Sequence, residues 1–356
     1  MQLRGHAPLT ELLVTKPRRI VLINTRAPGD LAVLTALVRD IALTYPGQYE
    51  IDVDTTAKDI WRNNPHLTPL RNGKAWQKDI EYVKIQYGRG LRDQNHETVH
   101  FLAYFHRDFE RQCKIKVPLT LPYPDLHLNE QERNTRIVEG RYWVVINGGK
   151  SDFTAKVWRS RNMQTVVDRL RGHGLGVVQA GASEAGHWHL PLRGVLDLVG
   201  RTSLRDFMRL LYQADGVITM NSVAMHLAAG LHRPCVVIAG GREAWWWCAY
   251  VPENTGLGGT EVAQRLLVPQ RFLHTIGLLE CSRVRGCWKN KVVPLHNDKS
   301  ICKHPVLHPD QPVPQCLDLV TPDHVLTAVL SYYYDGTLKA PPNTPLAEEV
   351  KGLYQM

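Results

Sequence analysis

Cysteine is scarce in this chain of 356 residues, and long apolar runs are absent. Seven cysteines are too few for a disulfide-stapled scaffold, and their odd number leaves at least one thiol unpaired. The longest apolar stretches run to about seven residues, against the roughly 20 that a spanning helix needs. The N-terminus has no basic region leading into an apolar segment, so we expect neither a membrane span nor a secretion signal. These absences favour a protein of the reducing cytoplasm.

The composition is that of a folded enzyme. With 22% charged and 44% hydrophobic residues, the chain falls outside the disordered and fibrous classes. At roughly 150 residues per domain, its length predicts two domains. Lys and Arg outnumber Asp and Glu by 43 to 34, which gives a formal net charge of +9. Such an excess attracts nucleotide phosphates, phosphorylated glycans, nucleic acid or an anionic membrane surface, without choosing among them.

Strand patterns alternate with helix patterns along most of the chain. The expected strands are 19–24, 50–53, 80–85, 142–147, 176–179, 216–219 and 234–238, and the expected helices are 31–42, 57–63, 101–113, 160–170, 204–213 and 223–231. This alternation implies parallel sheets covered on both faces, which is an α/β fold. The Pro-rich stretch 117–124 interrupts it. We therefore predict two Rossmann-like, doubly wound domains, at 1–135 and 136–336, and a loosely held extension at 337–356.

The loops after the strands predict a transferase. Parallel sheets bind ligands beyond the carboxyl ends of their strands, and two such domains across a cleft can bring a nucleotide-linked donor to an acceptor. A dehydrogenase is the main rival. However, the loop 25–30 after the first strand holds one glycine and a proline, so the three spaced glycines of a dinucleotide site are absent.

Several segments carry a family resemblance. Gly29-Asp30-Leu31 precedes a helix, Asn64-Pro65 follows a second helix, and Lys156-Val157-Trp158 heads a third. The most distinctive run, 197–241, contains 198–204 (LVGRTSL) and 225–234 (MHLAAGLHRP). In order and spacing these segments resemble the family-nine glycosyltransferases, typified by ADP-heptose:lipopolysaccharide heptosyltransferases. The resemblance implies the GT-B fold, in which two domains face each other across a cleft, and an inverting transfer.

Two residues are predicted to carry the chemistry. Glycosyl transfer needs a base that takes the proton of the acceptor hydroxyl, and the resemblance implies that Asp30 is this base. From its residue type alone, Asp30 is more typical of a cap on a helix that begins at Leu31, and the resemblance reverses that order. The two roles are also compatible. Lys156 is expected to stabilise the charge that develops on the leaving diphosphate. The alternative for Lys156 is an ordinary surface lysine.

The predicted donor-binding residues follow strands or open helices, where backbone N–H groups and polar side chains can hold phosphates and hydroxyls. They are Gly29, Asn147, Gly148, Gly149, Glu184, Asn221, Ser222, His226, Gly240, Gly241 and Arg242. A plain turn at Asn147-Gly148-Gly149, an exposed loop position for Glu184 and a packed position for His226 are open alternatives. Asn221 and Val223 stand where the family has Asp and Gly, so the resemblance leaves the donor sugar undetermined.

A cysteine cluster lies in the last quarter of the chain, at 281–316. Cys281, Cys287, Cys302 and Cys316 suit a tetrahedral zinc site. Their spacing is looser than that of Cys-x2-Cys pairs, so two disulfides or four unrelated thiols are alternatives, and His296, His304 or His308 could replace one ligand. We predict a structural zinc, and no cofactor for catalysis.

The predicted function is an inverting, metal-independent glycosyltransferase. It would move a heptose or related hexose from an ADP-heptose-like nucleoside-diphosphate donor to a hydroxyl of an anionic acceptor, a glycan of the lipopolysaccharide type. One alternative keeps the fold but uses hydroxylated DNA bases as acceptor, because the basic clusters 89–92 and 156–161 could contact phosphates. Another is a non-catalytic module that binds nucleotide sugars or glycans. The charge also allows peripheral membrane contact.

Overall fold

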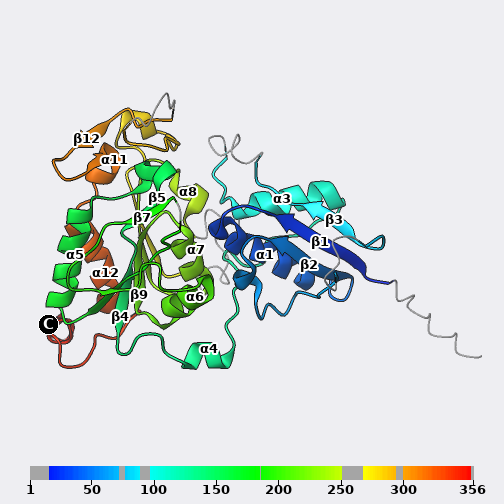
Figure 1. Cartoon of the computed structure of the whole chain (residues 1–356), viewed down its shortest axis with the longest axis horizontal. Coiled ribbons are helices and arrows are strands. Elements are labelled where there is room, and N and C mark those ends of the chain that lie inside the picture. The colour runs from blue at the N-terminus through cyan, green and yellow to red at the C-terminus, as the bar shows by residue number, and fades with distance from the viewer. Residues whose placement is uncertain are drawn as a thin grey trace, which may run out of the picture.

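Two α/β lobes joined by a linker make up the molecule (Figure 1). The computed structural model describes residues 16–71, 77–88, 97–184, 186–250, 268–293 and 300–353. Each lobe contains its own parallel sheet, so the predicted α/β fold class is confirmed. None of the helices in these ranges is long and apolar enough to cross a membrane.

The N-terminal lobe has a parallel sheet in the order β2-β1-β3. Its strands are β1 (Arg18–Asn24), β2 (Tyr49–Thr55) and β3 (Glu81–Lys84). Along β1 the β-branched and apolar residues alternate between the two faces. Ile20 and Leu22 pack into the cluster that contains α1 (Pro28–Thr44) and α3 (Leu102–Cys113).

The opposite face of this sheet differs from the expectation. Val21 packs there against Leu70 and Ile80, which lie outside the helices, so within the described residues this face is covered by loop segments. The predicted helix at 57–63 is a single 3-10 turn, η1 (Lys58–Trp61).

The C-terminal lobe is built on six parallel strands in the order β11-β10-β9-β4-β6-β8. They are β4 (Tyr142–Val145), β6 (Gly176–Gln179), β8 (Leu196–Asp197), β9 (Gly216–Met220), β10 (Cys235–Gly240) and β11 (Gln270–His274). The chain enters at β4, extends the sheet to one side, then returns through β9 to build the other side. The strand order therefore reverses between β4 and β9, and such a switch point is where open parallel sheets bind ligands.

Helices cover both faces of this second sheet. Trp143 and Val145 of β4 pack in one cluster with α5 (Ser160–Gly172) and α12 (Pro322–Tyr334). Tyr142 and Val144, which point the other way, pack with α6 (Leu204–Gln213) and α7 (Val223–Gly230). The remaining elements are α4 (Glu130–Asn134), β5 (Gly148–Lys150), η2 (Ser151–Lys156), β7 (His187–His189), α8 (Trp245–Cys248), η3 (Glu280–Ser282), β12 (Pro305–Leu307), β13 (Pro312–Pro314), α11 (Gln315–Asp318) and α13 (Pro345–Leu353).

The C-terminal extension is not loosely held, which corrects the expectation. Its described part, 337–353, contains α13, and Leu346 on that helix is fully buried. Leu338, Ala340 and Val350 pack against the same core cluster as α5 and α12. These apolar side chains anchor the segment because burying them removes their surface from water.

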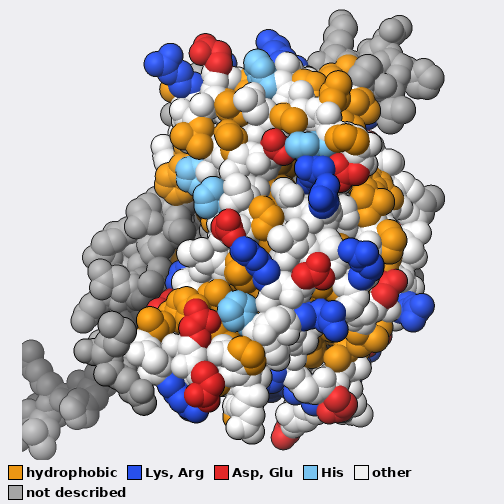
Figure 2. Space-filling view, turned by 90° about the vertical axis from the view of Figure 1, so that its left-hand side faces the viewer, with side chains coloured by type: hydrophobic (Ala, Val, Ile, Leu, Met, Phe, Trp, Pro, Cys, Tyr) orange, Lys and Arg blue, Asp and Glu red, His pale blue; other side chains and the backbone are white. Residues whose placement is uncertain are grey.

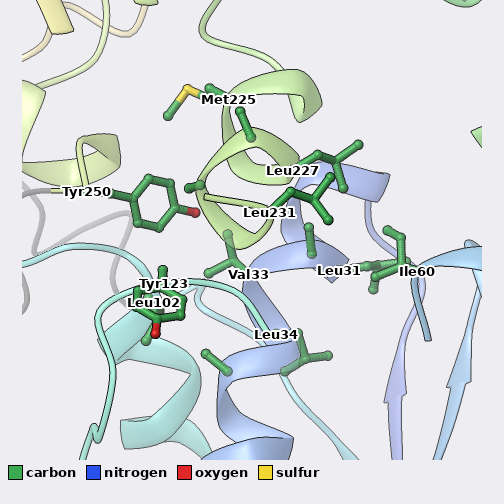
Figure 3. Packing of buried hydrophobic residues seen from close by; sticks show 14 of the residues in the cluster. Leu31, Val33, Leu34, Ile60, Leu102, Tyr123, Met225, Leu227, Leu231 and Tyr250 are labelled. Atoms are coloured by element: carbon green, nitrogen blue, oxygen red, sulfur yellow. The ribbon is translucent and has the colours of Figure 1, made fainter. Parts of the chain in front are cut away.

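The two lobes share one continuous apolar core. Helix α1 is buried on all sides from Leu31 to Ile41, which is the pattern of an interior helix. Figure 3 shows its side chains Leu31, Val33 and Leu34 beside Leu227 and Leu231, which come from α7 and the residue after it. Where α1 meets α7, the interface between the lobes is therefore part of the apolar core.

Arg205 of α6 binds the linker, which is the segment between the two lobes that contains α4. We call this set of contacts the clasp. The buried Arg205 guanidinium donates to both carboxylate oxygens of Glu132, at 2.7 and 2.6 Å. It also donates to the backbone carbonyls of Asp59 at 3.1 Å and His127 at 2.7 Å. Glu132 lies in α4, Asp59 in the N-terminal lobe and Arg205 in the C-terminal lobe, so one side chain connects all three.

Replacing Glu132 tests this clasp. The Arg205 hydrogen bond lowers the pKa of Glu132 to about 2, against 4.5 for the ordinary group. The stabilisation is therefore complete above pH 4.5 and is lost as the pH falls toward 2. We expect Glu132→Gln to lower the free energy of unfolding by about 1.5–3 kcal/mol at pH 7, because charge-assisted hydrogen bonds are lost. Urea unfolding should show a smaller difference in stability between wild type and Glu132→Gln at pH 3 than at pH 7.

The matched control is Glu139→Gln, in the same linker. Glu139 is 90% exposed and lies 3.8 Å from Arg136, so we expect a change below about 0.5 kcal/mol. Equal losses in the two variants would contradict the clasp.

Candidate active site

The N-termini of α1 and α7 meet between the lobes. The two helices follow the carboxyl ends of β1 and β9, where parallel sheets bind ligands. A Cβ added to Gly29 would lie 3.2 Å from Cδ2 of His226 and 3.5 Å from Cα of Val223. A side chain at position 29 would therefore require the His226 ring to shift by a few tenths of an ångström, and the glycine permits the close contact. Two positive helix ends thus point into one region.

Asp30 lies in the first turn of α1. The helix begins at Pro28 after the N-cap residue Ala27, so Asp30 is not the N-cap of a helix that starts at Leu31. The hydroxyl of Tyr87 donates to its Oδ1 at 3.0 Å. Burial raises the pKa of Asp30, while the Tyr87 hydrogen bond and the charges of Arg26 and Lys156 oppose the rise. A carboxylate whose pKa is raised is a better base, which suits the predicted role.

Lys156 is held by a buried carboxylate. Its Nζ lies 2.7 Å from Oε1 of Glu243, and Arg242 pairs with the same oxygen. The other oxygen, Oε2, accepts from the side-chain amide of Asn221. Burial alone would raise the pKa of Glu243, but Lys156 and Arg242 lower it below its ordinary value. Two cations around one carboxylate leave a net charge of +1 in this cluster, which can meet an anion.

Glu243 is a site residue that sequence reasoning missed. It follows the predicted Gly240-Gly241-Arg242 segment by one position, and its glutamate type alone gives no signal. The structure joins it to three predicted residues, Lys156, Asn221 and Arg242. The carboxylate that Asn221 lacks relative to the family pattern is thus present within hydrogen-bonding distance.

Ser222 and His226 of the predicted set have structural partners. Ser222 caps α7, where its Oγ accepts from the Ala224 backbone N–H at 3.2 Å. His226 is buried, and its Nδ1 lies 2.6 Å from the hydroxyl of Tyr250. Burial lowers the pKa of His226 well below its ordinary value, and His100 and Lys156 add to the effect. The imidazole is therefore neutral near pH 7.

The predicted segment 147–149 forms neither a plain turn nor an open loop. The amide of Asn147 donates to Oγ of Ser160 and to the carbonyl of Leu190, both at 2.8 Å. Gly148 and Gly149 belong to β5, which pairs with β7. A Cβ on Gly148 would lie 2.0 Å from the carbonyl oxygen of Trp188, so packing of the hairpin requires this glycine.

The charged cluster consists of Lys156, Arg242, Glu243 and Asn221. Three predicted residues lie outside it, namely Gly240, Gly241 and Glu184. Gly240 has a φ of 62°, and Cβ atoms on Gly240 and Gly241 would come within 3.3 Å of Cys316. The two glycines allow close packing against the cysteine segment. Glu184 is 80% exposed in the loop after β6. For Glu184 the structure thus gives the exposed position that the sequence left open.

The four clustered cysteines line one small cavity. Cys281, Cys287, Cys302 and Cys316 surround about 10 Å³, roughly the space of one water molecule. All seven cysteines lie within the described ranges, and none of them forms a disulfide. His304 lines the same cavity, His308 pairs with Asp318, and His296 is outside the described residues. Among the described side chains, however, no three His, Cys, Asp or Glu stand at the spacing of ligands around a metal ion.

The cysteine segment braces both sides of the charged cluster. The backbone N–H groups of Cys287 and Trp288 donate to the carbonyls of Gly241 at 3.2 Å and Arg242 at 2.9 Å. The Ala155 N–H, next to Lys156, donates to the carbonyl of Asn290 at 2.9 Å. The segment therefore holds η2 and the loop after β10 at a fixed distance.

Two of the three basic residues in the predicted cluster 156–161 are paired with carboxylates. Within 156–161, Lys156 pairs with Glu243 and Arg159 pairs with Asp310. The second cluster, 89–92, lies outside the described residues.

Two α/β lobes, each built on a parallel sheet, face each other with Asp30 on one side and Lys156 on the other. This arrangement is the architecture of a GT-B transferase. The family model for glycosyltransferase family 9 (heptosyltransferase) matches residues 68–269, more than half of the chain. The protein therefore belongs to glycosyltransferase family 9, and the predicted family, fold and enzyme class are confirmed.

Solved structures show the same fold. The chain matches E. coli ADP-heptose LPS heptosyltransferase II with a TM-score of 0.52 and 16% identity, covering 90% of this chain and 100% of the other. For the family 9 glycosyltransferase of Veillonella parvula DSM 2008 the TM-score is 0.55, the identity 12%, and the coverage 89% and 97%. For the iron-containing dodecameric glycosyltransferase TibC of enterotoxigenic E. coli H10407 they are 0.55, 17%, and 90% and 77%. A search of curated proteins finds no match.

Replacing Glu243 tests the charged cluster. We expect Glu243→Gln to lower the free energy of unfolding by about 3 kcal/mol at pH 7, because two cations lose their buried partner. The pKa of Glu243 is lowered, so wild type also loses this stabilisation as the pH falls below the ordinary pKa range of glutamate. The difference in the free energy of unfolding between wild type and Glu243→Gln should therefore become smaller. Chemical denaturation at pH 7 and pH 4 measures both effects.

Glu81→Gln serves as the control, since the Arg18–Glu81 pair is exposed by 40% and 49%. That variant should cost less than about 1 kcal/mol. A Glu243 variant as stable as this control would show that the cluster contributes nothing.

Proposed function

We propose that this enzyme transfers a heptose or related hexose by an inverting displacement that needs no metal ion, with Asp30 as base and Lys156 on the leaving group. The observation that carries the proposal is the proximity of Asp30 and Lys156, which come from different lobes. Gly29, next to Asp30, packs against Val223, and Asn221, two residues before Val223, shares the Glu243 carboxylate with Lys156. The Lys156 charge accordingly opposes the rise in the pKa of Asp30. In this arrangement Asp30 of the N-terminal lobe acts on the acceptor hydroxyl, and Lys156 of the C-terminal lobe acts on the leaving diphosphate.

The reaction is a single displacement. The acceptor hydroxyl attacks the anomeric carbon while Asp30 takes its proton, and the bond from that carbon to the diphosphate oxygen breaks. The electron pair leaves with the nucleoside diphosphate. Attack from the side opposite the leaving group inverts the anomeric centre. Lys156 and Arg242 stabilise the developing negative charge, which is the task that a divalent metal would otherwise perform.

The donor is proposed to bind at the C-terminal lobe. Asn221, Ser222 and the α7 N-terminus lie beside the switch point of the sheet, where nucleotides bind in this class of fold. The structure of TibC has been solved in complex with ADP-D-β-D-heptose. The name of the E. coli ADP-heptose LPS heptosyltransferase II also includes ADP-heptose. These relatives support an ADP-heptose-like donor.

The acceptor is proposed to be an anionic glycan of the lipopolysaccharide type, bound at the N-terminal lobe in the cytoplasm. The formal net charge of +9 supports an anionic partner. On the outer face of the C-terminal lobe, Lys and Arg are interspersed with Asp and Glu, so the positive charge does not gather on that side (Figure 2).

Two substitutions test the catalytic assignment. We expect Asp30→Asn to lower turnover by about 100-fold or more while the nucleotide affinity stays within a factor of two, because only the base is lost. Lys156→Ala should weaken the binding of nucleoside diphosphates. Binding is measured by calorimetry with a panel of nucleoside diphosphates. Transfer is measured by mass spectrometry with nucleotide sugars and deacylated lipopolysaccharide core, and with hydroxymethylated DNA as the rival acceptor.

Asp79→Asn and Lys116→Ala are matched controls, since both side chains are exposed and paired with other surface groups. Unchanged turnover in Asp30→Asn would remove Asp30 from the mechanism. Transfer to DNA alone would overturn the glycan acceptor, and failure to bind any nucleotide would overturn the donor assignment.

We further propose that Cys281, Cys287, Cys302 and Cys316 hold one structural metal ion. Four thiols around a cavity of ionic size suit a tetrahedral site. Three sulfurs also accept backbone hydrogen bonds, from Lys289 to Cys287, from His304 to Cys302 and from Gly241 to Cys316. Such bonds favour the thiolate, against the burial that raises the pKa of all three thiols. Zinc is the predicted ion, and iron is the alternative because TibC contains it.

Elemental analysis tests the metal site. We expect about one zinc or iron per chain, lost in Cys287→Ser and retained in Cys113→Ser, which changes a thiol in the other lobe. Because the cysteine segment braces Arg242 and η2, the metal-free variant should also bind nucleoside diphosphates more weakly. Wild-type protein from zinc- and iron-supplemented medium that contains neither ion would refute the site.

A further inference from the structure

Tyr87 and Asp30 are brought together by two adjacent strands. Tyr87 follows the carboxyl end of β3, and the loop that leads to Asp30 follows the carboxyl end of the neighbouring β1. The buried side chain of Asn24 joins the two loops. It donates to the carbonyl of Ile85 and accepts from the Arg26 N–H, both at 2.9 Å. The distance between the two loops is thus fixed.

The Tyr87 hydroxyl lies between Asp30 and Arg26. It donates to Oδ1 of Asp30 at 3.0 Å and accepts from Nη1 of Arg26 at 3.3 Å. The Arg26 guanidinium also lies 4.3 Å from the centre of the Tyr87 ring, a cation–π contact. Burial and the charge of Asp30 raise the pKa of Tyr87 far above its ordinary value, so the hydroxyl keeps its proton.

Aromatic rings from both lobes fix the orientation of Tyr87. Phe101 and Phe105 meet its ring edge-on, at centroid distances of 5.5 and 5.3 Å. Trp247, from the C-terminal lobe, meets it at 6.2 Å. The lobes are also joined here by a backbone hydrogen bond of 3.1 Å from the Phe101 N–H to the Trp247 carbonyl. Residues of both lobes therefore contact the Tyr87 ring.

We propose that Tyr87 is a positioning residue for the base: its hydroxyl holds Oδ1 of Asp30 so that the other oxygen, Oδ2, faces the acceptor hydroxyl. The proposal rests on the proposed function, since it needs Asp30 as base. During transfer the acceptor proton moves to Oδ2, and Tyr87 retains its own proton throughout. Because Trp247 of the other lobe also contacts the Tyr87 ring, the assembled cleft contributes to the orientation of the base.

The groups around Asp30 determine the pH dependence. Tyr87, Arg26, Lys156 and the backbone N–H of Ala27 all favour its charged form, against the effect of burial. His226, which lies across the interface from Gly29, is neutral near pH 7. Loss of the Tyr87 hydrogen bond therefore raises the pKa of Asp30. The acid limb of kcat/KM reports the base of the free enzyme, so it must move to higher pH.

Tyr87→Phe is the test, because it removes the hydroxyl and keeps the ring. We expect kcat to fall about tenfold, with the donor KM within a factor of two, and the acid limb of kcat/KM to move to higher pH. Arg26→Gln should move the acid limb in the same direction without changing the aromatic cluster. Tyr45→Phe is the matched control. Its hydroxyl donates to the carbonyl of Lys116 at 2.7 Å, away from the site, and its profile should equal that of wild type.

An unshifted acid limb in both Tyr87→Phe and Arg26→Gln, with Asp30→Asn inactive, would overturn the positioning role and leave the proposed function standing. Full activity in Asp30→Asn would overturn both, since no base would remain to be positioned. Thermal unfolding of each variant separates a loss of folding from a loss of positioning.

Discussion

The packing of α1 against α7 is the constraint on which the rest of the structure depends. Helix α1 is buried on every side because it lies between the N-terminal sheet and the C-terminal lobe. Gly29 allows the first turn to approach Val223 and His226. Since close-packed interiors tolerate little change of volume, this contact fixes the relative position of the lobes. It also brings together two helix N-termini, and the chemistry proposed for the enzyme takes place between them.

The polar groups around this contact are held from several directions. Glu243 holds Lys156, Arg242 and Asn221, which come from three separate segments of the C-terminal lobe. The cysteine segment fixes the two backbone segments that carry Lys156 and Arg242. In the N-terminal lobe, Asn24 and the aromatic cluster do the same for Asp30 through Tyr87. Such preorganisation spares the reaction the cost of ordering charges when the donor arrives.

Much of the fold could be predicted from patterns of local sequence. The β-branched run of β1 and the apolar spacing of α1 each specify one element. Twelve of the thirteen predicted strands and helices fall close to their predicted ranges, because periodicity is a local property. The 3-10 turn η1 and the loop-covered face of the first sheet were missed, since packing against distant residues decides them. The extension was predicted to be loose because its prolines suggest a tail, yet Leu346 finds a core that no local pattern reveals.

The sequence by itself determined the alternation of strands and helices, the family motifs, and the residue types Asp30 and Lys156, because these are written in short segments. Only the tertiary structure decided which of the candidates act together. It joined Glu243 to Lys156, placed Tyr87 on Asp30 across 57 positions of chain, and assigned Asn147 and Gly148 to hairpin packing. The physical reason is that hydrogen bonds and ion pairs depend on distance in space, and the crossing connections of parallel sheets bring together loops that lie far apart in sequence.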